Sequence, residues 1–264
     1  DDLVYKMREG LECNVALFSL DENNPRIQHH CKRGGLAAVA ENGYVTIMKG
    51  TWKIRVDRIA NIPLTFGGWA TFNVQNILAS VLACFVQGFK IEDIKMALET
   101  FIPSPAQTPG RMNIFRFKNF TVLVDYAHNA HGLQAISSFI AHVDATPKVG
   151  VIAGVGDRRD EDIRDIGRIA AKTFDEVVIR QDKNLRGRSD QEIIELLIEG
   201  MKEIKANIKY TVIPNEKEAI EFVIKNAKKD SFITICLDVV PDVLETIMRY
   251  KEQEDAMPVS TNFA

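Results

Sequence analysis

The segment Val122–Gly132, which reads VLVDYAHNAHG, carries a dense group of side chains that can do chemistry. An apolar run ends in Asp125, and His128 follows just before a stretch with helical spacing. Parallel strands of α/β domains bind ligands at their carboxyl ends, and a helix N-terminus favours anions. Asp125 is therefore a candidate to hold a ribose or a metal ion, and His128 a candidate phosphate donor. The alternative is that Asp125 or Asn129 only caps the following helix.

A second polar loop, Gly154–Asp162, reads GVGDRRDED and follows the next apolar run. Its glycines permit close approach of the backbone, and its arginines, Arg158 and Arg159, are suited to carboxylates. The alternative is a solvated cluster of charges at the start of a helix. The loop is not the phosphate-binding sequence GxxxxGKS or GxxxxGKT, and neither occurs anywhere in the 264 residues.

A third loop, Arg180–Arg188, reads RQDKNLRGR and again follows an apolar run. Arg186 and Arg188 present two guanidinium groups about a glycine, an arrangement suited to a substrate carboxylate. Asp182 is a candidate to pair with a cationic group of a substrate. Three charged loops at successive strand ends predict a polar site along one edge of a sheet.

Outside these loops the chemical signals are weaker. Asn73 and Asn76 are three residues apart and share a helix face, although an asparagine at a helix start usually caps. His29 and His30 lack partners at metal-ligand spacing, so we interpret them as surface or strand residues. No metal site is predicted.

The elements that position the three loops alternate regularly after residue 110. Apolar strands separated by amphipathic helices are typical of a parallel sheet covered on both faces, which predicts a doubly wound α/β domain. Strands are predicted at Asn113–Phe117, Thr121–Asp125, Val149–Ala153, Glu176–Ile179, Lys209–Ile213 and Phe232–Leu237, and helices at about Gly132–His142, Asp162–Phe174, Asp190–Ile204, Glu216–Asn226 and Pro241–Lys251.

Residues 1–110 have a different pattern. Residues 1–66 read as short strands separated by turns, with Asn42-Gly43 a strong turn signal. The segment Ile102–Gly110 holds three of the nine prolines, so helices cannot continue through it, and we place a domain boundary there. Within the first region the sequence predicts a strand at Asn14–Ser19, a hairpin of Tyr44–Met48 with Trp52–Val56, and helices at Val74–Gln87 and Ile91–Phe101.

Composition excludes several classes of protein. With 33 basic and 36 acidic residues the formal net charge is −3, which argues against a nucleic-acid binder. No apolar run approaches the roughly 18 residues of a membrane span, and no signal-peptide pattern is present at the start. The four cysteines lie far apart, as is typical of reduced thiols in a cytoplasmic protein. The first residue is Asp, which predicts a fragment of a longer chain.

Seven segments resemble the Mur ligase superfamily, from Asp1 to about Tyr250. DYAHN is shared by several Mur-type ligases, including folylpolyglutamate synthetases. GDRRDEDI together with RGR is more specific to the branch that adds arginine to poly-aspartate. The segments are DDLVYKMRE, ALFSLDENNPRI, FNVQNILAS, PGRMNIF, DYAHNAHG, GVGDRRDEDI and DKNLRGR.

The resemblance implies an activity. Such ligases use ATP and Mg²⁺ to join a carboxylate to an amine through an acyl phosphate. The implied reaction adds L-arginine to aspartate side-chain carboxylates of a poly-aspartate primer, in the cytoplasm, without nucleic acid or membrane. A homo-oligomer is compatible with it because related enzymes assemble. The alternatives are a peptidoglycan or folylpolyglutamate type of ligase, or a non-catalytic ligand-binding module derived from one.

The resemblance also implies roles for individual residues. Asn73 corresponds to the adenine contact, although Phe72 replaces the usual histidine. Arg111 corresponds to the arginine that reaches the γ-phosphate, Asp125 to the ribose-binding acid, and His128 to the next position on the phosphate side. Arg111 and His128 are therefore the predicted catalytic residues.

A loop of the last domain binds the incoming amino acid in this superfamily. Asp182, Arg186 and Arg188 match that loop. The carboxylate of the substrate arginine is expected at Arg186 or Arg188, and its guanidinium at Asp182 or the acidic loop Asp157–Asp162. Asp157 and Arg158 of that loop are therefore also predicted to bind the substrate.

By resemblance, residues 1–104 are the end of a central ATPase domain and residues 105–110 a hinge. Residues 111–252 are then a Rossmann-like C-terminal domain, followed by a flexible tail, 253–264. The phosphate-binding loop and most Mg²⁺ ligands of the family precede the segment that matches this chain. We therefore expect that the chain alone does not hydrolyse ATP.

Overall fold

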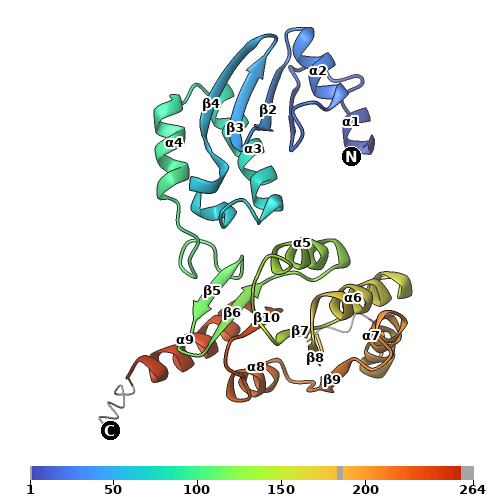
Figure 1. The fold of residues 1–264 in the computed structure, drawn as a ribbon. Coiled ribbons are helices and arrows are strands. Elements are labelled where there is room, and N and C mark those ends of the chain that lie inside the picture. The colour runs from blue at the N-terminus through green and yellow to red at the C-terminus, as the bar shows by residue number, and fades with distance from the viewer. Residues whose placement is uncertain (1, 183–186, 257–264) are drawn as a thin grey trace. The chain divides into compact units, whose positions relative to one another are not determined.

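The computed structural model describes residues 2–182 and 187–256, and these form two compact units (Figure 1). Unit 1 comprises Asp1–Ile102 and unit 2 comprises Pro103–Ala264. The division falls at the start of the proline-rich segment. Among the described residues, no helix combines the length and the apolar character needed to cross a membrane.

Unit 1 is built on a four-stranded sheet in the order β1-β2-β3-β4. The edge strand β1 is parallel to β2, whereas β3 is antiparallel to both of its neighbours. The turn between β2 and β3 is the predicted Asn42-Gly43, with φ values of 50° and 79°. The strands are β1 (Ala16–Ser19), β2 (Leu36–Glu41), β3 (Tyr44–Lys49) and β4 (Trp52–Arg58), and the helices are α1 (Asp2–Lys6), α2 (Pro25–Lys32), α3 (Thr71–Val86) and α4 (Ile91–Thr100).

The core of unit 1 forms where the apolar face of α3 packs on the sheet. Val74, Ile77 and Leu78 of α3 are buried together with Val45 and Ile47 of β3. Two short 3₁₀ turns, η1 (Ile59–Asn61) and η2 (Pro63–Thr65), carry the chain from β4 to α3. Both predicted helices, α3 and α4, are confirmed, with boundaries that differ by at most three residues.

Three helices or strands of unit 1 are absent from the sequence prediction, namely the short helix α1, helix α2 and strand β2. The turn formers of Asp21–Arg26 predict turns there, but Pro25–Lys32 is helix α2, and both His29 and His30 lie on it. Of the two alternatives for His29 and His30, surface or strand, the strand is therefore wrong, whereas His29 is exposed on the helix and His30 is half-buried. The strand β2 (Leu36–Glu41) was also missed, although it is central in the sheet and pairs with both β1 and β3.

Unit 2 is the predicted doubly wound α/β domain. Its sheet has the order β5-β6-β10-β7-β8-β9, and all neighbouring strands are parallel except β5, which is antiparallel to β6. The last strand in the sequence thus lies in the interior of the sheet. The strands are β5 (Asn113–Arg116), β6 (Phe120–Asp125), β7 (Lys148–Ile152), β8 (Glu176–Ile179), β9 (Lys209–Val212) and β10 (Ser231–Cys236).

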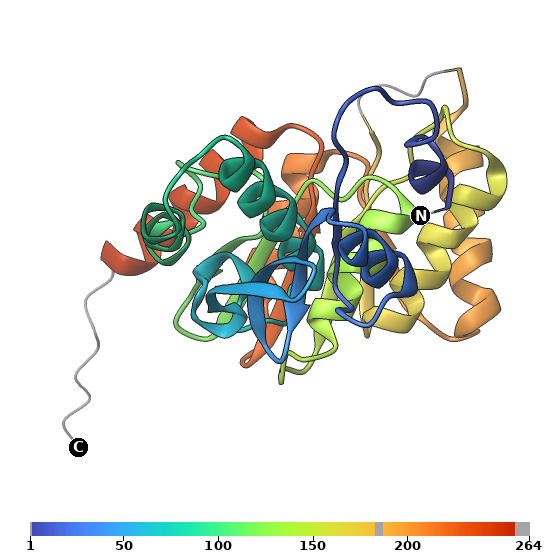
Figure 2. The same ribbon diagram turned by 90° about the horizontal axis from the view of Figure 1, so that it is seen from above.

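Helices cover both faces of this sheet. The helices α5, α6 and α7 lie on one face and α8 and α9 on the other, and α6 and α7 lie side by side in both views (Figures 1 and 2). Helix α9 runs five residues beyond its predicted end at Lys251, so residues 253–256 are helical and the expected start of the flexible tail is wrong. The helices are α5 (Ala130–Ile140), α6 (Asp160–Thr173), α7 (Asp190–Ile204), α8 (Glu216–Lys225) and α9 (Val240–Ala256).

Candidate functional site

The parallel strands of unit 2 end at one edge of the sheet, and the loops that follow them meet there. The pairing register places Asp125 of β6 beside Cys236 of β10, and β10 separates β6 from β7. A small cavity of about 30 Å³ opens at this edge. Its lining comes from the loops after β6, β7, β8 and β10, and includes Tyr126, His128, Val155, Arg180, Asp182 and Asp238. Three of the loops singled out in the sequence therefore converge.

Asp125 stands at the last position of β6 and is 8% exposed. Its Oδ2 accepts a hydrogen bond of 2.9 Å from the backbone N–H of Met112, which adopts a left-handed φ of 50°. Burial raises the pKa of the Asp125 carboxyl above its usual value of 3.8, opposed by the Met112 N–H, the charge of Arg111 and the Ala127 N–H. A buried carboxyl with a raised pKa at a strand end is a mark of a functional site.

The helix cap is Asn129 and not Asp125. The Asn129 Oδ1 accepts a 2.7 Å hydrogen bond from the N–H of Gly132 in the first turn of α5. This assigns Asn129 the structural role that the sequence left open between the two residues. The Asp125 side chain does not cap this helix.

Arg111 and His128 both lie close to the Tyr126 ring. The guanidinium carbon of Arg111 is 5.0 Å from the centre of that ring, and the His128 ring is also 5.0 Å away. His128 Nδ1 is 3.1 Å from the Tyr126 carbonyl oxygen. Both the Arg111 and the His128 side chains are exposed, so the two predicted catalytic groups are accessible at the same edge as Asp125.

Arg188 binds groups of its own unit. Its Nε donates to the carbonyl oxygen of Gly156 and its Nη2 to that of Arg158, both at 3.0 Å. Its Nη1 forms ion pairs with Asp160 at 2.7 Å and with Glu192 at 2.8 Å. These contacts tie the loop after β7 to the start of α7, and they favour a supporting role for Arg188 over direct binding of a substrate carboxylate.

Arg158, Asp182 and Arg186 are further predicted substrate-binding residues of the two charged loops. Arg158 Nε lies 3.8 Å from Asp157 Oδ1 and, among the described residues, has no hydrogen-bond partner although it is buried. Asp182 lines the small cavity. Arg186 lies outside the described residues, so its predicted position beside Asp182 stays a prediction.

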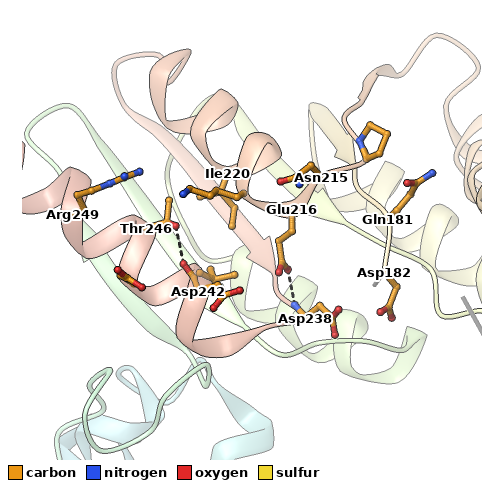
Figure 3. A pocket seen from close by; sticks show the side chains of 13 residues that line it. Gln181, Asp182, Asn215, Glu216, Ile220, Asp238, Asp242, Thr246 and Arg249 are labelled. Atoms are coloured by element: carbon orange, nitrogen blue, oxygen red, sulfur yellow. Dashed lines mark hydrogen bonds between the residues drawn. The ribbon is translucent and has the colours of Figure 1, made fainter. Parts of the chain in front are cut away.

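A larger cavity of about 610 Å³ adjoins the same edge, between α8 and α9 (Figure 3). Asp182 and Asp238 line both cavities. The larger one also has Glu216, Asp242 and Glu245 in its lining, against Lys217 and Arg249, so its surroundings are predominantly acidic.

Two buried residues at this edge escaped the sequence analysis. Arg180, at the first position after β8, is 4% exposed, and Glu216, at the first position of α8, is 9% exposed. Arg180 Nε and Glu216 Oε1 are 3.2 Å apart. An arginine directly after a buried strand was the available signal, but the sequence does not show which carboxylate reaches it.

Asn73 lies in unit 1, in the first turn of α3, and is 7% exposed. Its Nδ2 donates a 2.8 Å hydrogen bond to the carbonyl oxygen of Leu64, and Asn76 Nδ2 lies 3.5 Å from its Oδ1. Asn73 therefore joins α3 to the preceding 3₁₀ turn and is not a helix cap. Its assignment as the adenine contact stays a prediction.

The described part of the chain contains no group of three or more His, Cys, Asp or Glu side chains arranged to hold a metal ion.

Comparison with known proteins places the chain in a family. Residues 110–236 match the model described as "Mur ligase, glutamate ligase domain". The cyanophycin synthetase of Geminocystis herdmanii is 41% identical over 250 residues, which cover 95% of this chain and 28% of that protein. The chain thus spans under a third of the length of such relatives.

More distant relatives share the fold. The UDP-N-acetylmuramoyl-L-alanyl-D-glutamate–2,6-diaminopimelate ligase 1 of Clostridium acetobutylicum is 34% identical over 168 residues, covering 62% of this chain and 33% of that protein. The structure of E. coli FolC in complex with ADP superposes with a TM-score of 0.58 at 15% identity, over 84% of this chain and 47% of that one. These findings confirm the predicted fold class and resemblance: residues 110–236 belong to the Mur ligase family, and the chain is homologous over nearly its whole length to part of the cyanophycin synthetases.

Proposed function

We propose that this chain is part of an ATP-dependent ligase that adds L-arginine to the side-chain carboxylates of a poly-aspartate backbone, the reaction of a cyanophycin synthetase. The convergence of Asp125, His128 and Asp182 on one edge of the unit 2 sheet is the observation that carries this proposal. The 41% identity to a cyanophycin synthetase supports the choice of substrates. The proposed partners are ATP, L-arginine and the primer.

The proposed reaction has two steps. A carboxylate oxygen of an aspartate side chain attacks the γ-phosphorus of ATP, which gives an acyl phosphate and ADP. The α-amine of arginine then attacks the acyl carbon, the phosphate leaves, and the amine loses a proton. Mg²⁺ would lower the repulsion between the phosphates and the attacking carboxylate. We propose that residues outside this chain supply most of the ligands of that ion.

The residues of unit 2 have distinct roles in this proposal. Asp125 accepts hydrogen bonds from the ribose hydroxyl groups, which suits a buried carboxylate at a strand end. Arg111 and His128 lie on the same edge, where the Arg111 guanidinium compensates negative charge on the phosphates and His128 donates a hydrogen bond to them. In unit 1, Asn73 contacts the adenine.

The incoming arginine would be held by the loops after β7 and β8. Its guanidinium pairs with Asp182, and its carboxylate with Arg186 or Arg158. Asp157 lies beside Arg158 and keeps that guanidinium near the loop. Arg188, with its four described contacts, holds this loop in place.

The proposal is tested by phosphate release from the full gene product that carries this chain, with ATP, Mg²⁺ and a poly-aspartate primer. Arginine, lysine, glutamate and diaminopimelate are compared, and Arg186→Ala is the test variant. Arg116→Ala, which removes an exposed arginine at the end of β5 away from Asp125, is the matched control. We expect release with arginine, a loss of at least about tenfold in Arg186→Ala, and no change in the control.

Other outcomes point elsewhere. Release with diaminopimelate or glutamate in place of arginine would assign a peptidoglycan or folylpolyglutamate type of ligase. No release with any amino acid would favour a non-catalytic binding module. The 264-residue chain alone is expected to release no phosphate, and contaminant-free ATPase activity from it would contradict the proposed division of labour.

A further inference from the structure

Burying the ion pair of Arg180 and Glu216 costs the free energy of desolvating two charges. Arginine and glutamate are seldom fully buried unless they are paired, and desolvation of both charges offsets much of their attraction. An apolar pair of similar size would often fill such a space with equal or greater stability. The benefit of the charged pair must therefore lie in the groups that it holds.

Those groups are the backbones of the surrounding loops. Arg180 Nη2 and Nε both donate to the carbonyl oxygen of Cys236, at 2.9 and 3.2 Å. Arg180 Nη1 donates to the carbonyl oxygen of Gln181 at 3.1 Å. One guanidinium thus fixes the end of β10 and the start of the loop that carries Asp182. An apolar side chain could make neither contact.

Glu216 completes the arrangement from the start of α8. Its Oε1 accepts a 2.7 Å hydrogen bond from the backbone N–H of Asp238 (Figure 3). Its Oε2 accepts a 3.3 Å hydrogen bond from the backbone N–H of Val239. The loop 237–239, which joins β10 to α9, is therefore held at its peptide N–H groups. The preceding N–H, of Leu237, donates to the Asp125 carbonyl oxygen at 3.0 Å.

We propose that Arg180 and Glu216 are positioning residues, which hold the loop 237–239 and set the places of Asp182 and Asp238 in the site for the incoming amino acid. This inference rests on the proposed function. Asp182 lies two residues after Arg180, and the backbone N–H of Asp238 donates a hydrogen bond to Glu216. The side chains of both aspartates line the two cavities at this edge. The pair acts on the amino acid and not on the nucleotide.

A first experiment measures amide hydrogen exchange in the 264-residue chain. Glu216→Gln keeps the size of the side chain but leaves one acceptor oxygen and no charge. We expect exchange of the Asp238 and Val239 amides to accelerate at least about tenfold. Glu176→Gln is the matched control. Glu176 also forms an ion pair, with Lys228, but it lies at the start of β8, and Arg180 follows the end of that strand. This control should leave both amides unchanged.

A second experiment measures steady-state kinetics in the full gene product. Arg180→Met and Glu216→Gln are each expected to raise the KM for arginine about tenfold or more, with the KM for ATP within about twofold of the unaltered enzyme. The double variant removes both charges and so avoids an unpaired buried ion. We expect it to recover the melting temperature but not the KM for arginine, which a merely structural role would restore.

The two experiments separate failure of this inference from failure of the proposed function. Unchanged exchange at Asp238 and Val239 overturns the positioning role whatever the reaction is. Equal rises in both KM values, or recovery of the arginine KM in the double variant, overturn it as well. An unaltered gene product without amino-acid-dependent phosphate release instead contradicts the proposed function, and the exchange result then still decides whether the pair holds the loop.

Discussion

Each unit buries a carboxylate at the end of a strand, and the two carboxylates have different surroundings. Glu41 ends β2 in unit 1 and is 5% exposed. It accepts hydrogen bonds from the Lys53 ammonium, the Thr46 hydroxyl and the Arg55 guanidinium. Asp125 ends β6 in unit 2 and is 8% exposed, and its side chain accepts a hydrogen bond from the backbone N–H of Met112.

This difference appears in their acidities. The hydrogen bond from Lys53 holds the pKa of Glu41 below its usual value of 4.5, against the effect of burial. For Asp125 burial dominates and raises the pKa. A carboxylate surrounded by cations of its own unit contributes to the fold. A carboxylate for which nearby cations do not offset the cost of burial retains the capacity to bind a ligand. Burial alone therefore does not identify a binding site.

The largest expected effect is on the KM for ATP, and it tests whether Asp125 binds a ligand whereas Glu41 does not. Asp125→Asn in the full gene product should raise the KM for ATP about 10- to 100-fold, because an amide offers a ribose one neutral acceptor in place of a charged carboxylate. Steady-state phosphate release at varied ATP measures it. Glu41→Gln, the same neutralisation in unit 1, is the control and should leave this KM unchanged. An unaltered KM in Asp125→Asn would remove Asp125 from the nucleotide site.

A smaller effect is expected on the stability of unit 1. Glu41→Gln should destabilise it at neutral pH by about 1–2 kcal/mol, because the Lys53 and Arg55 partners are partly exposed. Since folding lowers the pKa of Glu41, its contribution is present above 4.5 and is lost as the pH falls through the folded value.

Tryptophan fluorescence during urea unfolding measures this change. Both tryptophans, Trp52 and Trp69, lie in unit 1, so the signal reports on that unit. The difference between the wild type and the variant should shrink below about pH 4.5. A difference that stays constant with pH would show that the charge of Glu41 contributes nothing to the fold.

The smallest expected effect has the opposite sign. Since folding raises the pKa of Asp125, its contribution to stability is present below 3.8 and is lost as the pH rises through the folded value. Asp125→Asn should therefore stabilise unit 2 slightly at neutral pH, and the gain should vanish toward pH 3.8. Hydrogen exchange of the β6 and β10 amides at several pH values checks this. A loss of stability at neutral pH in Asp125→Asn would show that the Asp125 carboxylate stabilises the fold, as Glu41 does.

Much of unit 2 could be predicted from the sequence because its strands are continuous apolar runs. The segment Ser231–Cys236 is buried at every position, and Val122–Val124 are fully buried, so both runs stand out without regard to their partners. Turn chemistry was equally local at Asn42-Gly43, where both residues have positive φ. Such features depend on residues that are close together in the sequence.

The missed elements of unit 1 had weaker patterns. In α2 the signal was present, since Asn24 caps the helix and Pro25 occupies a first-turn position, but the polar stretch around it resembled a turn. The strand β2 reads LAAVAE, and alanine favours helices as much as it fits a buried strand. Its strand conformation comes from pairing with β1 and β3 and not from its own residues.

The candidate site was predicted by position but not by contact. The three loops could be placed at one edge because parallel strands all end there. The partners of Arg188 and the pairing of Arg180 with Glu216 depend on residues between 4 and 36 positions away in the sequence, joined only by the fold. Types and spacing therefore indicated where ligands bind, whereas the supporting contacts needed the structure.

The interior place of β10 has a consequence for how unit 2 is made. Its neighbours, β6 and β7, are translated about 80 residues or more before it and cannot join each other until β10 lies between them. A nascent chain that has not reached Ser231 therefore exposes two apolar strand edges and lacks the scaffold that brings Asp125, Arg180 and Asp238 together. Unit 2 therefore closes only after Cys236 has been translated, and the site is assembled from that point on.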